Sequence, residues 1–124
     1  MMQATWLDIG PVAQIEPGTA ATLPVEGGAE IAVFHTMRGE VYALVNRCPH
    51  KAGPLSQGIV HGDSVTCPLH NWRISLRSGE ALGDGPDERG ACVPTIPVKV
   101  DAGRIYLLRE AVVPAKAAQQ AQAA

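Results

Sequence analysis

The feature that most constrains this chain is a pair of short cysteine–histidine motifs. One residue separates Cys48 from His50, two separate Cys67 from His70, and sixteen residues lie between the motifs. Thiolates and imidazoles bind soft and borderline metals, and two matched pairs of them indicate a metal site. We therefore take these four residues as the candidate ligands.

The way in which the two residue types are mixed discriminates between metals. A structural zinc site usually takes two cysteines from one loop and two histidines from another. Here each loop supplies one cysteine and one histidine. This mixture suits a two-iron cluster in which one iron binds both thiolates and the other both imidazoles, the ligand set of a Rieske-type [2Fe–2S] centre. A non-redox zinc module that holds two loops together is the alternative.

Replacing two thiolates by imidazoles changes the charge of such a cluster. A thiolate adds a negative charge, whereas a neutral imidazole adds none, so the cluster accepts an electron more readily and its reduction potential rises. The second ring nitrogen of each histidine can also carry or lose a proton. The pattern therefore predicts an electron-transfer function.

Length and charge limit the other possible functions. A chain of 124 residues suffices for one domain and is too short for a catalytic domain beside the cluster module. A net charge of −2 offers no basic surface for nucleic acid or an anionic membrane. The sequence shows neither a membrane span nor a secretion signal. We expect a cytoplasmic protein, in which the odd cysteine, Cys92, is a small buried hydrophobic residue.

Short β-rich runs separated by turn residues fill most of the chain. Ile31–His35 and Val41–Val45 flank a glycine-containing turn and predict a hairpin that leads into Cys48. The further predicted strands are Thr5–Ile9, a segment around Thr22–Val25, Ile59–Val60, Val65–Thr66, Trp72–Leu76, Thr95–Val100 and Arg104–Leu108. Helical periodicity is absent before residue 110. The sequence predicts an all-β fold of small stacked antiparallel sheets with two protruding cluster-binding loops.

The end of the chain differs in composition. Residues 111–124 are mostly Ala and Gln, which favour helix, but a segment of this length is marginal as an isolated helix in water. We expect one domain over residues 1–110, followed by a tail over 111–124 that frays or becomes helical against a partner.

With these motifs placed, the chain resembles Rieske-type ferredoxins and, among them, the small subunit of assimilatory NAD(P)H-dependent nitrite reductase. The resemblance covers about residues 31–109. It is carried by Cys48–Gly62, Val65–Trp72, Gly79–Ala81, Cys92–Val100 and Gly103–Leu107. The two ligand motifs are specific for the Rieske superfamily, whereas the segment after His50 and the Thr95–Val100 strand favour the nitrite reductase branch.

The resemblance implies a subunit that transfers electrons to, or docks on, a large catalytic subunit. That partner would hold flavin, a [4Fe–4S] cluster and sirohaem, and would reduce nitrite to ammonia. The sequence shows no catalytic triad, nucleotide-binding glycine loop or paired catalytic carboxylates, so we expect no complete active site in this chain. The alternative is a free-standing Rieske ferredoxin that delivers electrons to an aromatic-ring dioxygenase.

The resemblance also bears on the reduction potential. Rieske proteins of high potential carry an additional cysteine in each ligand loop, at positions that correspond to about Gly53 and Leu69 here. They also have a Gly-Ser pair where this chain has Asn71 and Trp72. Fewer hydrogen bonds to the cluster sulfurs lower the potential. We expect a value of roughly −150 to 0 mV by redox titration; a strongly positive value would contradict this inference.

Overall fold

The computed structural model describes residues 5–24, 30–48, 54–68, 72–83 and 91–111. In these residues the strands are β1 (Trp6–Pro11), β2 (Thr19–Leu23), β3 (Ile31–His35), β4 (Val41–Val45), β5 (Ile59–His61), β6 (Ser64–Thr66), β7 (Arg73–Ser75), β8 (Thr95–Ile96), β9 (Val98–Asp101) and β10 (Arg104–Leu108). Three short 3-10 helices accompany them: η1 (Val12–Gln14), η2 (Leu55–Gln57) and η3 (Arg109–Ala111).

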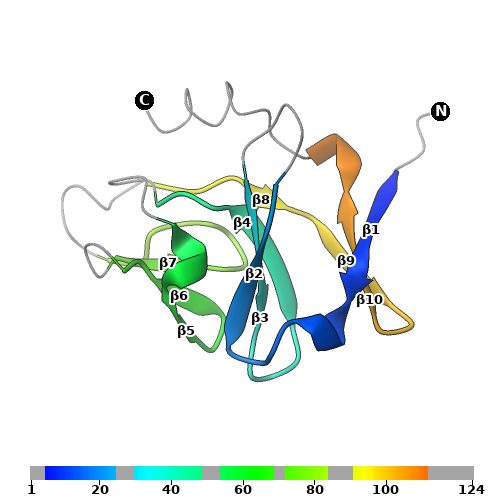
Figure 1. Cartoon of the computed structure of the whole chain (residues 1–124). Coiled ribbons are helices and arrows are strands. Elements are labelled where there is room, and N and C mark those ends of the chain that lie inside the picture. The colour runs from blue at the N-terminus through cyan, green and yellow to red at the C-terminus, as the bar shows by residue number, and fades with distance from the viewer. Residues whose placement is uncertain (1–4, 25–29, 49–53, 69–71, 84–90, 112–124) are drawn as a thin grey trace.

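The strands form three antiparallel sheets. A four-stranded sheet has the order β2-β3-β4-β8, and two three-stranded sheets have the orders β1-β10-β9 and β5-β6-β7. The four-stranded sheet lies between the other two in Figure 1. The predicted all-β fold of stacked antiparallel sheets is therefore confirmed. Among the described residues, no helix has the length and apolar character required to span a membrane.

The central position of β3 explains its composition. All five of its residues are buried, as expected for a strand covered on both faces, whereas in β10 buried residues alternate with exposed or half-buried ones. Val33 of β3 lies on the side of Ile9 and Ile105, which come from the β1-β10-β9 sheet. A single buried cluster thus joins the sheets, and Cys48 and Cys67 belong to it.

The predicted hairpins are confirmed, and the last strand region differs from its prediction. The β3–β4 hairpin has the predicted bounds, and β5–β6 and β9–β10 turn where the sequence indicated. The single strand expected over Thr95–Val100 is two strands, of which β8 pairs with β4 and β9 pairs with β10. Pro97 separates them, because it has no N–H to continue a ladder. The chain changes sheets at this residue.

Two local contacts connect segments in and beside the outer sheets. Gly79 has a φ of +78°, and a Cβ added there would overlap the backbone oxygen of Val93. Its own oxygen accepts a hydrogen bond from Val93 N at 2.8 Å. On the opposite sheet, Arg104 Nε donates to Asp8 Oδ2 at 2.9 Å and so connects β10 with β1.

We expect Gly79→Ala to destabilise the protein much more than Gly39→Ala. Both glycines have positive φ, which costs an L-residue about 1–2 kcal/mol. Open space surrounds a Cβ built at Gly39, whereas at Gly79 the backbone of Val93 must also move. Urea unfolding of the two variants measures the difference. Equal losses would show that the close approach at Gly79 contributes nothing.

The Asp8–Arg104 pair predicts a small pH dependence of stability. The hydrogen bond from Arg104 lowers the pKa of Asp8 below its ordinary value of 3.8. The folded state then binds fewer protons than the unfolded state near that pH. This contribution is complete above the ordinary pKa and is lost as the pH falls through the folded-state value.

We expect Asp8→Asn to flatten the loss of stability in acid, with a small amplitude because the pair is exposed. Urea unfolding at a series of acidic pH values measures the effect. Glu16→Gln, which changes an exposed carboxylate in the turn before β2, is the control. An unchanged acid slope in Asp8→Asn would contradict the prediction.

Candidate metal centre

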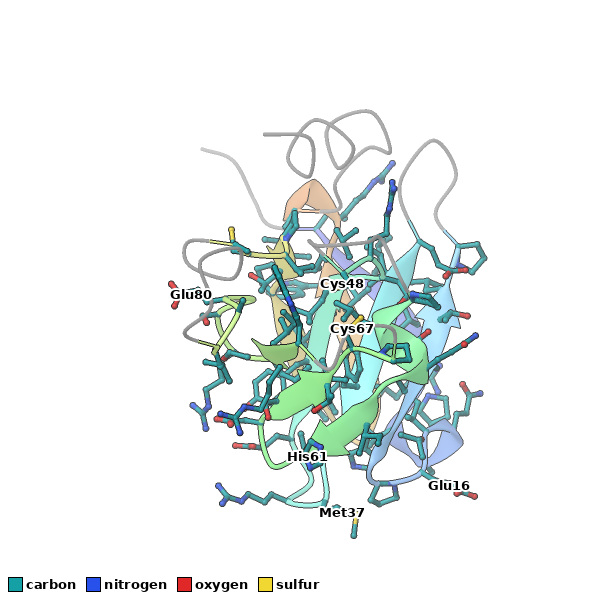
Figure 2. The ribbon with its side chains drawn as sticks, turned by 90° about the vertical axis from the view of Figure 1, so that its left-hand side faces the viewer. Glu16, Met37, Cys48, His61, Cys67 and Glu80 are labelled. Carbon is teal, nitrogen blue, oxygen red and sulfur yellow. The ribbon has the colours of Figure 1, made fainter. Side chains whose placement is uncertain are left out.

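The two cysteines of the predicted ligand set each lie just after a strand, and the two strands belong to different sheets. Cys48 follows β4 of the central sheet, and Cys67 follows β6 directly. Both side chains are fully buried. In Figure 2 they lie away from the end that carries Met37 and His61. The fold therefore brings two residues that are nineteen positions apart into one buried cluster.

A backbone hydrogen bond closes the segment that contains Cys67. Cys67 N donates to Trp72 O at 2.6 Å, so the chain returns to the same place after five residues. Trp72 is buried, so this bond ties Cys67 to a core residue. This closure fixes where the loop begins and ends.

The two predicted histidine ligands, His50 and His70, lie outside the described residues, and their ligand role stays a prediction. The other histidines of the chain are placed elsewhere. His35 is buried, and its Nδ1 lies 2.6 Å from Ile15 O. His61 is exposed at the end of β5. Since the chain has four histidines, His50 and His70 are the two left to serve as imidazole ligands.

The chemistry of the placed residues fits a thiolate-bound cluster. No disulfide joins the three cysteines, all of which lie in the described part of the chain. A thiolate in apolar surroundings is unfavourable unless a metal or another partner compensates its charge. The described residues alone contain no group of three or more potential metal ligands. Cys48 and Cys67 would therefore provide the sulfur side of the site, and His50 and His70 stay the predicted imidazole ligands.

Cys92 does not occupy the buried position that the sequence predicted. It is exposed, and it forms an isolated β-bridge with Glu80. Its neighbour Val93 is buried instead. Successive residues of an extended segment point to opposite faces, so the inward position of Val93 turns Cys92 outward.

Sequence reasoning missed two polar clusters. Asn46, two residues before Cys48, is buried and bonded to Ser56. The sequence feature that could have revealed this cluster is an asparagine so close to a ligand motif. Arg77 connects two turns: its Nε donates to Asp63 Oδ2 at 2.7 Å, and its Nη2 lies 3.4 Å from Glu40 Oε2. The hydrogen bond to Asp63 raises the pKa of Arg77. Long-range pairs of this kind leave no periodic signal in a sequence.

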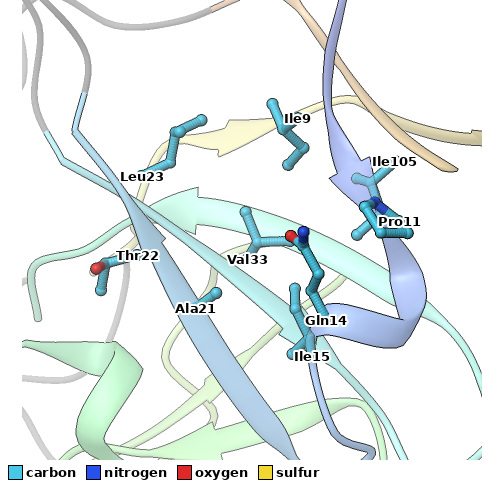
Figure 3. Close-up of a pocket in the computed structure, with 9 residues that line it drawn as sticks. All are labelled: Ile9, Pro11, Gln14, Ile15, Ala21, Thr22, Leu23, Val33 and Ile105. Carbon is cyan, nitrogen blue, oxygen red and sulfur yellow. The ribbon is translucent and has the colours of Figure 1, made fainter.

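A cavity of about 180 Å³ opens between β1 and β2 (Figure 3). Most of its lining comes from β1, β2 and the segment of η1, with one residue each from β3 and β10. It is mostly aliphatic, with Ile9, Leu23 and Ile105 among its residues. Gln14 and Thr22 are the polar side chains that line it. None of the lining residues has a titratable side chain, so this cavity offers no acid, base or charged metal ligand.

The chain matches the family model of the Rieske [2Fe–2S] domain over residues 5–97. A ferredoxin component of the naphthalene 1,2-dioxygenase system from Pseudomonas aeruginosa is 32% identical over 86% of this chain and 97% of its own length. Two solved structures assigned as nitrite reductase small subunits are also similar. The NADH-dependent one from Mycobacterium tuberculosis has 25% identity, covers 87% of this chain and 97% of its own, and gives a TM-score of 0.75. The NADPH-dependent one has 31% identity, covers 84% of this chain and 98% of its own, and gives a TM-score of 0.71.

This chain therefore belongs to the Rieske [2Fe–2S] domain family, whose members bind a two-iron cluster for electron transfer. Its cofactor is a Rieske-type [2Fe–2S] cluster, as the mixed ligand pattern predicted. The zinc alternative is set aside on this ground. The cluster accepts and donates single electrons when bound.

We expect Cys48→Ala and Cys67→Ala to abolish cluster binding, since each removes a thiolate that the buried site requires. Both variants should purify without visible absorption, whereas wild type should contain about two irons and two sulfides per chain. Cys92→Ala is the matched control, because this cysteine is exposed and should be dispensable. Retention of a full cluster in either buried-cysteine variant would contradict the ligand assignment.

Proposed function

We propose that this chain is the small subunit of an assimilatory NAD(P)H-dependent nitrite reductase. It would hold the cluster through Cys48, His50, Cys67 and His70, and transfer electrons to, or dock on, a large catalytic subunit with flavin, [4Fe–4S] and sirohaem. We further propose that residues 1–110 act as the single Rieske domain and that 111–124 form a tail outside it.

The observation that supports this function is the end-to-end similarity to two nitrite reductase small subunits. The match covers 97% and 98% of the length of these two subunits. The Lys51–Gly62 and Thr95–Val100 segments, which favoured this branch in the sequence, support the same choice.

The burial of the cysteines indicates how the chain would take part. Cys48 and Cys67 are enclosed by the core, so the sulfur side of the cluster would be shielded from water and partner. The imidazole side, supplied by His50 and His70, would then be the route by which an electron leaves. The chain's own residues would orient the cluster, and the reduction of nitrite would take place on the large subunit.

A second candidate is supported by the curated relative. The match to the naphthalene dioxygenase ferredoxin covers 86% of this chain and 97% of that ferredoxin. We therefore retain a ferredoxin that delivers electrons to an aromatic-ring dioxygenase. The two functions share the cluster and differ in the partner that receives the electron.

Affinity purification of the tagged chain from its native cells separates the two functions. We expect a large partner with flavin and sirohaem absorption and nitrite-dependent oxidation of NADH or NADPH. Recovery of a terminal oxygenase in its place would favour the ferredoxin function.

Substitution of the predicted imidazole ligands tests the role of the cluster. We expect His50→Ala and His70→Ala to lose the Rieske spectrum and to impair the activity of the complex. His61→Ala, at an exposed histidine on β5, is the matched control and should retain both. If the ligand variants kept both the spectrum and the reductase activity, the proposal would fail.

A further inference from the structure

The side chain of Asn46 connects the start of the first cysteine segment with η2. Its Nδ2 donates to Ser56 Oγ at 3.0 Å and to Glu30 Oε1 at 2.7 Å, and its Oδ1 accepts from Ser56 N at 2.8 Å. Both amide donors and the acceptor are thus used. Asn46 is 5% exposed, so water cannot readily replace these bonds.

The network fixes the orientation of the amide. With the amide reversed, Oδ1 would face the Glu30 carboxylate, and Nδ2 would face the Ser56 N–H as one donor against another. A backbone bond from Asn46 N to Glu30 O, at 2.9 Å, holds the same residue from the other side. Asn46 therefore has one favourable arrangement, and it lies two residues before Cys48.

The other end of η2 touches the second cysteine segment. Leu55 is fully buried, and a Cβ added at Gly58 would overlap the backbone oxygen of Thr66. Thr66 immediately precedes Cys67. The short helix is thus held to the segment of Cys48 by Asn46 and packed without a gap against the segment of Cys67.

We propose that Asn46 and Ser56 are positioning residues that set the separation of Cys48 and Cys67 through η2. The inference rests on the proposed ligand role of these cysteines. The hydrogen bonds between Asn46 and Ser56 would keep the two sulfur donors at one spacing. A fixed spacing would slow the loss of iron from the bound cluster. Neither Asn46 nor Ser56 needs to touch the cluster for this role.

The test compares cluster release in the holoprotein with global stability. Bleaching of the visible absorption by an iron chelator is measured for wild type, Asn46→Ala, Asn46→Asp and Ser56→Ala. Urea unfolding of the same preparations is followed by circular dichroism. We expect release about 10- to 100-fold faster for Asn46→Ala, the range for residues that orient metal ligands. A changed electron paramagnetic resonance spectrum of the reduced cluster should accompany it.

Thr36→Ala is the matched control. Thr36 is also buried, and its Oγ1 accepts a hydrogen bond from Glu40 N at 3.0 Å, beside Met37 at the end away from the cysteines. We expect this variant to lower the unfolding midpoint and to leave cluster release and the resonance spectrum unchanged.

A charge-conserving rescue provides the second measurement. Asn46→Asp keeps the oxygen that accepts from Ser56 N, but it loses the N–H groups that donate to Ser56 Oγ and Glu30 Oε1. It also places a second carboxylate beside Glu30, so release of the cluster should accelerate. Adding Glu30→Gln to this variant returns an amide donor and the original net charge, and should slow release again. If Asn46→Ala does not fold, Ser56→Ala and the comparison of Asn46→Asp with and without Glu30→Gln still test the positioning role.

The outcomes separate the positioning role from the proposed function. Wild-type release rates in the Asn46 and Ser56 variants, or equal acceleration in Thr36→Ala, would overturn the inference and leave the cluster assignment intact. A wild-type protein without iron and sulfide would overturn the ligand assignment, and the inference with it.

Discussion

The burial of two cysteine side chains is the constraint on which the rest of this structure depends. Cys48 and Cys67 are fully enclosed, and each follows a strand of a different sheet. A buried thiolate is unfavourable until a metal compensates it, so this position makes sense as one side of a metal centre. The sulfur side of the proposed site would therefore lie where the central sheet meets the β5-β6-β7 sheet, and the contacts between these sheets would position it.

Different interactions hold that junction at its two ends. Near the cysteines, the hydrogen bonds are made by buried residues: Asn46 bonds to Ser56, and Cys67 N donates to Trp72 O. At the other end, Arg77 joins two exposed turns through Asp63 and Glu40. Exposed ion pairs contribute little, whereas enclosed polar groups are costly to leave unpaired. The precision of the site should therefore come from the enclosed end.

The fold sets the class of chemistry and leaves the partner open. A ferredoxin of carbazole 1,9a-dioxygenase and a small subunit of nitrite reductase are both similar to this chain in architecture. Function on a shared fold is decided by the residues that meet the partner. In this chain we propose that these are the segments around His50 and His70.

The sequence by itself determined the cofactor and the hairpins and predicted the four ligands, because short spacings and alternating β-rich runs are local signals. Tertiary structure decided what depends on distant residues. Pro97 divides one predicted strand between two sheets, and Cys92 is exposed because Val93 takes the inward position. The Asn46–Ser56 network joins residues ten positions apart, with no periodic pattern to reveal it. Such contacts form only when segments that are distant in the sequence pack together in the fold. A local pattern of residues does not show which distant segments will pack together.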